Sequence, residues 1–130
     1  MSLTTYKQAI AETLSDIPGL QTWAYIPRSI TTPAAVVMPD LLNSFYIERG
    51  TAMADRRANL VIRIYANGEN QQVTEALDEL IVTVCDALES AGHAWSYVRT
   101  PGVDQSTYEG QAYLCADITI DNNYFDEEVI

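Results

Sequence analysis

Residues 57–92 read RANLVIRIYANGENQQVTEALDELIVTVCDALESAG, and this stretch decides the fold. Its opening part places apolar side chains at every second position, at Leu60, Ile62 and Ile64. This alternation predicts a strand over 57–66 with one apolar face and one mixed face. Asn67-Gly68 then marks a turn after the strand.

The rest of the stretch predicts a long helix over 71–91. Apolar residues recur there at steps of three and four, which is the spacing of one face of a helix. The residues of this face are Val73, Leu77, Leu80, Val84 and Leu88, widened by Ala76, Ile81 and Ala87. The opposite, solvated face carries Asp78, Glu79, Asp86 and Glu89. Asn70 is a candidate cap, and Gly92 predicts the helix end.

The N-terminal part of the chain predicts one more helix and two short strands. The helix covers 4–17, and Pro18-Gly19 ends it because proline cannot continue a helix and glycine accepts unusual backbone angles. Its apolar face comprises Leu3, Tyr6, Ile10, Leu14 and Ile17. Strands follow over 21–26 and 34–38, and the prolines that flank the second one favour a short edge strand.

Two further strands are predicted after the long helix, over 93–98 and 111–120. A polar loop separates them, and the last residues are rich in acids. This order of elements predicts an α+β fold: a two-layer sandwich of a mixed or mainly antiparallel sheet with two helices on one face, plus an extended loop or hairpin. We expect a single α/β domain over residues 1–121 and an acidic C-terminal tail, mobile without a neighbour, over 122–130.

Composition excludes several classes of function. The chain has 130 residues, 48% of them apolar, and a formal charge of −11 from 18 acids and seven bases, with Lys7 as its one lysine. Tight binding of duplex DNA needs clustered cations, and an anionic membrane surface attracts them. We therefore expect no tight binding of nucleic acid and no binding to a membrane. Residues 1–5 lack the pattern of a secretory signal, so we expect a cytoplasmic site of synthesis.

The chain shows no recognisable catalytic or metal-binding pattern. His93 is the one histidine, and a surface or capping role is favoured over catalysis. Cys85 and Cys115 lie in apolar patterns, which favours core packing over a disulfide and gives no zinc-ligand spacing. The acids of the C-terminal tail lack the spacing of a calcium loop, and no glycine-rich phosphate loop is present. We predict a structural protein, not an enzyme, with no cofactor.

Residues 41–55 do not match a regular element, yet they are too apolar for an ordinary loop. We interpret them as an extended hairpin or arm that contacts another subunit; a loop folded back onto its own domain is the alternative. Arginine beside aromatic residues and methionine is the composition of an interface core. The candidate interface residues are Phe45, Tyr46, Ile47, Arg49, Met53, Arg56 and Arg57.

Several short motifs together resemble the tail-terminator proteins of long-tailed actinobacterial phages. The N-terminal motifs are Ile17-Pro18-Gly19-Leu20, Trp23-Ala24-Tyr25-Ile26-Pro27, Ser29-Ile30 and Pro33-Ala34-Ala35-Val36-Val37. The later ones are Arg49-Gly50, Leu60-Val61-Ile62-Arg63-Ile64, Leu77-Asp78-Glu79-Leu80-Ile81 and the strand over 112–120. The likeness covers most of the chain, and the loop over 102–110 and the acidic tail depart from the pattern.

The resemblance implies a hexameric ring that caps the finished tail tube, ends its polymerisation and offers a joining surface to the head connector. It implies that the partners are further copies of the chain, the tail tube protein and the head–tail connector protein. DNA would only pass through the central channel, and the protein would reside in the virion at the junction of tail and neck. In such families an extended loop takes part in ring contacts, and the matching region here is 45–57.

Three other functions stay open from the sequence. A head-completion or connector protein of the same particle would share the small size and the oligomeric state. A small enzyme or ligand-binding domain would need a concave pocket with convergent polar groups. A tail-assembly adaptor would act during assembly and be missing from the finished virion.

Overall fold

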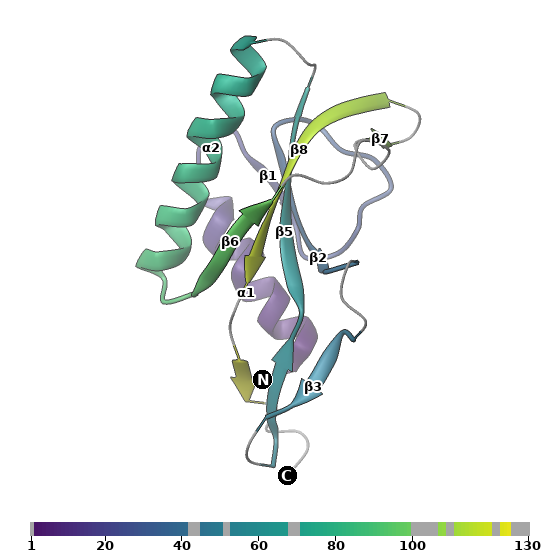
Figure 1. Ribbon diagram of the computed structural model, residues 1–130, viewed down its shortest axis with the longest axis vertical. Helices are drawn as coiled ribbons and strands as arrows, with labels where there is room; N and C mark the ends of the chain where they lie inside the picture. The colour runs from purple at the N-terminus through teal and green to yellow at the C-terminus, as the bar shows by residue number, and fades with distance from the viewer. Residues whose placement is uncertain are drawn as a thin grey trace.

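The computed structural model describes residues 2–41, 45–50, 53–67, 71–99, 107–108, 111–120 and 123–125. Within these residues the helices are α1 (Leu3–Ser15) and α2 (Gln71–Ser90). The main sheet has the strand order β1-β2-β5-β8-β6, with β7 added beside β8 (Figure 1). These strands are β1 (Gln21–Trp23), β2 (Ala34–Pro39), β5 (Leu60–Asn67), β6 (Trp95–Arg99), β7 (Thr107–Tyr108) and β8 (Gln111–Ile120).

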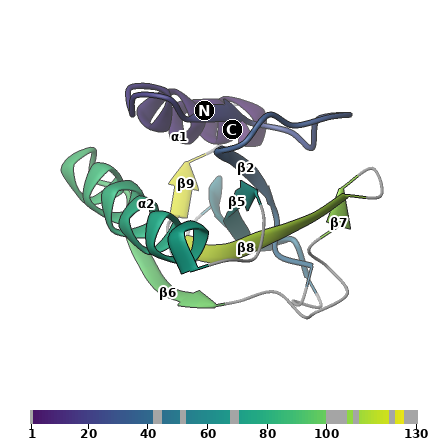
Figure 2. The same ribbon diagram turned by 90° about the horizontal axis from the view of Figure 1, so that it is seen from above.

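The predicted fold class is confirmed. The main sheet is mixed, because β1 pairs with β2 in parallel and the other neighbours are antiparallel. Both helices pack on the same face of this sheet (Figure 2). The chain is therefore an α+β sandwich of two layers, as the segregation of helices and strands predicts.

The two faces of the main sheet carry different cores. On the helix-covered face, Leu60, Ile62 and Ile64 of β5 pack with α1 and α2, which confirms the predicted apolar face of this strand. The opposite face carries a second apolar cluster, in which Trp23 and Ile30 pack partly buried against the sheet. The fully or nearly fully buried residues of that cluster are Ala34, Val36, Met38, Val61, Tyr65, Tyr113 and Cys115.

The helix ends follow the local sequence. The Ser2 hydroxyl accepts a hydrogen bond from the Thr5 backbone N–H at 3.2 Å and caps the start of α1. Gly19 and Gly92 follow the two helices with φ of 79° and 82°, a left-handed conformation that glycine adopts without strain. The predicted stops at Pro18-Gly19 and Gly92 are thus confirmed, whereas the candidate cap Asn70 lies outside the described residues.

A second, smaller sheet has the strand order β3-β4-β9 and lies beyond the lower end of the main sheet in Figure 1. Its strands are β3 (Ile47–Arg49), β4 (Asp55–Ala58) and β9 (Asn123–Phe125). β3 and β4 pair antiparallel, so the region over 41–55, in which the sequence matches no regular element, contributes to a hairpin. We call residues 45–50 and 53–58 the arm.

Several element ends shift by one or two residues from the prediction, and three segments differ by more. The strand predicted over 57–66 is divided at Asn59 into β4 and β5, because the Asn59 backbone turns to bond residues outside the main ladder. The strand predicted over 21–26 ends at Trp23, and its last two predicted residues, Tyr25 and Ile26, are exposed. The predicted tail contains β9, where aromatic residues that favour strands extend the open edge of β4; residues 121–122 and 126–130 lie outside the described residues.

The polar loop predicted between the last two strands contains β7, which pairs with the start of β8. The remaining residues of that loop, 100–106 and 109–110, lie outside the described residues. No described helix combines the length and the apolar character needed to cross a membrane.

Candidate subunit interface

The arm exposes large apolar side chains, which is the first property expected of an interface. Met53 is 72% exposed, Phe45 44% and Ile47 41%, and Leu41, just before the arm, is 64% exposed. Single exposed apolar residues are ordinary on a protein surface, but a group of them marks an interaction site. Half of the large apolar residues exposed within the described chain fall in this short stretch of sequence.

The arm also gathers positive charge. Arg49 and Arg57 are exposed and Arg56 is half-buried. Arg57 forms an ion pair with Glu48 across the hairpin, with 3.6 Å between Nη1 and Oε1. Arg49 and Arg56 are register partners on β3 and β4, so two like charges project from the same face of the hairpin. Like charges in directly opposed positions destabilise a sheet, and an acid supplied by a neighbour would remove that repulsion.

Tyr46 lies differently from the other predicted interface residues. It is half-buried against the main core, and its hydroxyl accepts a hydrogen bond from Lys7 Nζ at 3.2 Å. The ammonium group also lies 6.0 Å from the centre of the Tyr46 ring. All seven predicted residues therefore lie on the arm, and Tyr46 anchors the arm to α1.

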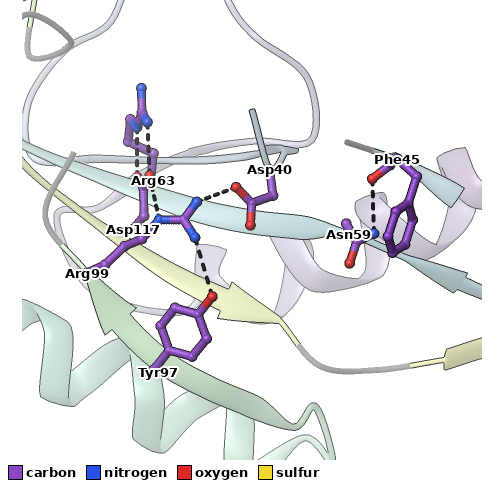
Figure 3. Close-up of polar contacts among 7 residues, drawn as sticks. All are labelled: Asp40, Phe45, Asn59, Arg63, Tyr97, Arg99 and Asp117. Carbon is purple, nitrogen blue, oxygen red and sulfur yellow. Dashed lines mark hydrogen bonds and ion pairs between the residues drawn. The ribbon is translucent and has the colours of Figure 1, made fainter. Parts of the chain in front are cut away.

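Asn59 holds the base of the arm. Its backbone N–H donates to the Tyr46 carbonyl at 2.7 Å, and its side-chain Nδ2 donates to the Phe45 carbonyl at 3.0 Å (Figure 3). Its own carbonyl accepts from the Asp40 N–H at 2.9 Å. A single residue thus joins the start of β3, the end of β2 and the junction of β4 with β5, which fixes the direction in which the arm leaves the body.

Replacing Asn59 with alanine is expected to loosen the arm and to lower the free energy of unfolding by about 1 kcal/mol, since one side-chain hydrogen bond is lost. Hydrogen exchange measured by mass spectrometry should show faster exchange in peptides covering 45–58, and unchanged protection in β5 and β8. Thr83→Ala, which removes a hydrogen bond of similar length on α2, is the control. Unchanged exchange in the arm would contradict the anchoring role.

A row of charged side chains, not expected from the sequence, crosses the face of the main sheet opposite the helices (Figure 3). Arg63 on β5 donates two hydrogen bonds to the Asp117 carboxylate on β8, at 2.7 and 2.9 Å. Arg99 on β6 lies on the other side of Asp117, with 4.0 Å between Nε and Oδ2, and it also bonds Asp40 at the end of β2. The two arginines and the two aspartates balance in charge.

Three residues of this row are buried, Arg99 is half-buried, and the row belongs to the fold. Arg63 is 7% exposed, Asp117 1% and Asp40 5%. The hydrogen bond to Asp117 raises the pKa of Arg63 above the ordinary value of a guanidinium, and the bond to Asp40 raises that of Arg99. The signal in the sequence was one charged residue at the centre of each apolar strand, Arg63 in one and Asp117 in the other.

These four charged residues pair with each other, and most of the other arginines of the chain lie on the arm. Arg63 and Arg99 are paired inside the protein, and three of the other five cations, Arg49, Arg56 and Arg57, lie on the arm, where Arg57 also pairs with Glu48. The arm itself carries only two acids, Glu48 and Asp55. A cationic arm therefore projects from a strongly acidic body, and these two surfaces are of opposite sign.

Cys85, Cys115 and His93 contribute to packing. Cys85 and Cys115 are buried and unpaired, as predicted from their apolar surroundings. His93 is half-buried just after α2, where its backbone N–H donates to the Leu88 carbonyl at 2.8 Å and its ring packs edge-on against Tyr6. Burial lowers the pKa of His93. No group of three potential metal ligands comes together within the described residues.

The thiols are expected to resist alkylation in the folded protein. Burial raises the pKa of Cys115 to about 11 from 9.0, and it also raises that of Cys85. At pH 8 the thiolate fraction of Cys115 should then be lower by roughly a hundredfold than in the unfolded chain, because each pH unit is a factor of ten. Alkylation by iodoacetamide, followed by mass spectrometry with and without urea, measures this. Equal rates in both states would contradict the burial of the thiols.

Comparison with protein-family models gives no match for this chain. Comparison with curated proteins also gives no match.

Proposed function

We propose that this chain is a structural virion protein that forms a ring, the hexamer that the resemblance implies, at the head-proximal end of a phage tail. The ring caps the tail tube, ends its polymerisation and offers a joining surface to the head connector. The observation that carries the proposal is the arm: exposed apolar residues and arginines project from an otherwise acidic body. The resemblance of the sequence motifs to tail terminators supplies the biological setting.

The physical argument concerns ring closure. A ring needs a heterologous interface, in which one patch of a subunit meets a different patch of the next. The arm and the acidic body are two unlike patches that attract each other. Phe45, Ile47 and Met53 would form the apolar centre of the contact, and the arginines its charged rim. Six copies around a channel would also concentrate negative charge near passing DNA, and repulsion would oppose sticking.

Sizing the purified protein, alone and with tail tube subunits added, tests the proposal. We expect self-association to a closed ring that binds the end of a tube and stops its growth. Cryo-electron microscopy of the particle then locates the ring. A protein that stays monomeric at every concentration, or a ring that touches the portal side and no tail tube, would overturn the terminator function; the second result would identify a head-completion protein.

Two more results would point to other classes of function. Absence of the chain from purified particles, measured by mass spectrometry, would favour an assembly adaptor. Turnover of a substrate by the purified protein would favour an enzyme.

A further inference from the structure

The outer face of α2 is the most acidic surface that the structure describes on a single element. The helix sequence contains five acids and no lysine or arginine. Asp78, Glu79 and Asp86 are exposed on this face, and no ion pair joins them to another described residue. The inner face of α2 packs into the main core through Leu77, Val84 and Leu88, so the fold needs none of these acids for packing.

An exposed apolar residue lies at the centre of these acids. Val82 is 59% exposed. Asp78 and Glu79 precede it by four and three residues, and Asp86 follows it by four, so all three are its neighbours on the helix surface. Asp78, Glu79, Val82 and Thr83 also line a shallow depression in the surface. The face therefore combines an apolar centre with an acidic rim.

The arm has the complementary pattern. Met53, Phe45 and Ile47 are its exposed apolar residues, and arginines surround them in sequence and in register. Interfaces commonly place apolar contacts at the centre and charged pairs at the rim, where opposite potentials select the partner. Among the surfaces described, the arm and the outer face of α2 match each other both in apolar character and in sign of charge.

The two surfaces cannot meet within one molecule. Along the longest axis of the chain, the arm lies at the lower end and α2 occupies the upper part (Figure 1). Contact between them therefore requires a second copy. A head-to-tail contact of two different patches is the kind of interface from which rings are built.

We propose that the outer face of α2, centred on Val82 and rimmed by Asp78, Glu79 and Asp86, receives the arm of a neighbouring copy of this chain. This inference rests on the proposed self-assembly and adds the identity of the acceptor. The arm arginines lie against the acids of α2, which removes the repulsion between Arg49 and Arg56 on the hairpin. The exposed apolar side chains of the arm cover Val82.

Charge reversal on each side, and on both sides together, tests the acceptor. Asp78→Lys with Glu79→Lys is expected to raise the dissociation constant for self-association by at least about tenfold, because it places cations opposite the arm arginines. Adding Arg56→Glu and Arg57→Glu to the same chain restores opposite signs and is expected to recover assembly. Glu12→Lys with Asp16→Lys, two exposed acids at the end of α1 and its C-cap, makes the same change in net charge and is the matched control.

The outcomes separate this inference from the proposed function. Wild-type assembly of the Asp78→Lys, Glu79→Lys variant, or equal weakening by the α1 control, would overturn the acceptor and leave ring formation standing. A wild-type protein that never self-associates would overturn the proposed function itself. Circular dichroism verifies that each variant is folded.

Cross-linking provides a second test that does not depend on charge. Met53→Cys and Val82→Cys place thiols on the two exposed surfaces, while the natural cysteines are buried. With a short bismaleimide, the double variant is expected to give covalent chains longer than dimers, and each single variant is expected to give none. A double variant that gives no product beyond those of the single variants would overturn the proposed contact.

Discussion

Replacing Asp117 with alanine is expected to lower the free energy of unfolding by roughly 3–5 kcal/mol, because removing one partner of a buried ion pair leaves the other charge without compensation. Arg63 would keep its place at 7% exposure and lose both of its hydrogen bonds to the carboxylate. Arg99, whose Nε lies 4.0 Å from Asp117 Oδ2, would also lose this nearby negative charge. Urea unfolding followed by circular dichroism measures the change.

The matched control replaces both charges with apolar residues of similar size, as Arg63→Met with Asp117→Leu. Such replacements are often neutral or stabilising, so this double variant should be more stable than Asp117→Ala alone. A loss below 1 kcal/mol for the single variant would contradict the structural role of the row. The raised pKa of Arg63 means that its contribution is present below the ordinary guanidinium pKa and is lost only as the pH rises above it. The difference between the variants should therefore be the same at pH 6 and pH 8.

Reversing two charges on the arm, as Arg56→Glu with Arg57→Glu, is expected to weaken self-association by roughly a hundredfold while the monomer stays folded. Charged rims contribute one to several kcal/mol when the signs are reversed, and a factor of ten in the dissociation constant corresponds to about 1.4 kcal/mol. The fold should tolerate the change, because the lost pair between Arg57 and Glu48 is exposed and contributes little. Light scattering measures assembly, and circular dichroism measures folding.

A comparison of single reversals separates the arm from a general effect of charge. Arg28 is an exposed cation outside the arm, so Arg28→Glu changes the net charge by the same amount as Arg56→Glu. We expect Arg28→Glu to assemble as the wild type does. If the double arm variant assembles normally, the arm is not an interface.

The fold was largely predictable from the sequence because its signals are periodic. Apolar residues at every second position define β5, and apolar residues at steps of three and four define α1 and α2. Both helix ends were predictable because glycine at Gly19 and Gly92 marks a left-handed residue. Each of these features depends on neighbours within a few positions along the chain.

The features that sequence reasoning missed depend on contacts between distant residues. Arg63 and Asp117 are 54 residues apart, and nothing local indicates that they form one pair. The second sheet joins β4 to β9 across about half of the chain, so a short segment near the C-terminus looks like a tail until its partner is known. The role of Tyr46 as an anchor likewise depends on Lys7 on another element. Composition predicted which residues form the arm, but the contacts of Tyr46 and Asn59 that attach the arm to the rest of the domain were not predictable.

The division of one strand run at Asn59 has a thermodynamic consequence. The same run of backbone supplies the middle strand of the small sheet and the central strand of the main sheet, so the arm is directly continuous with the domain interior. In the proposed ring, a neighbouring subunit binds the arm of the folded protein. Because it binds only the folded state, it also stabilises the whole subunit against unfolding, by mass action. The melting temperature should then rise with protein concentration, and the dilute, unassembled subunit should be the less stable form.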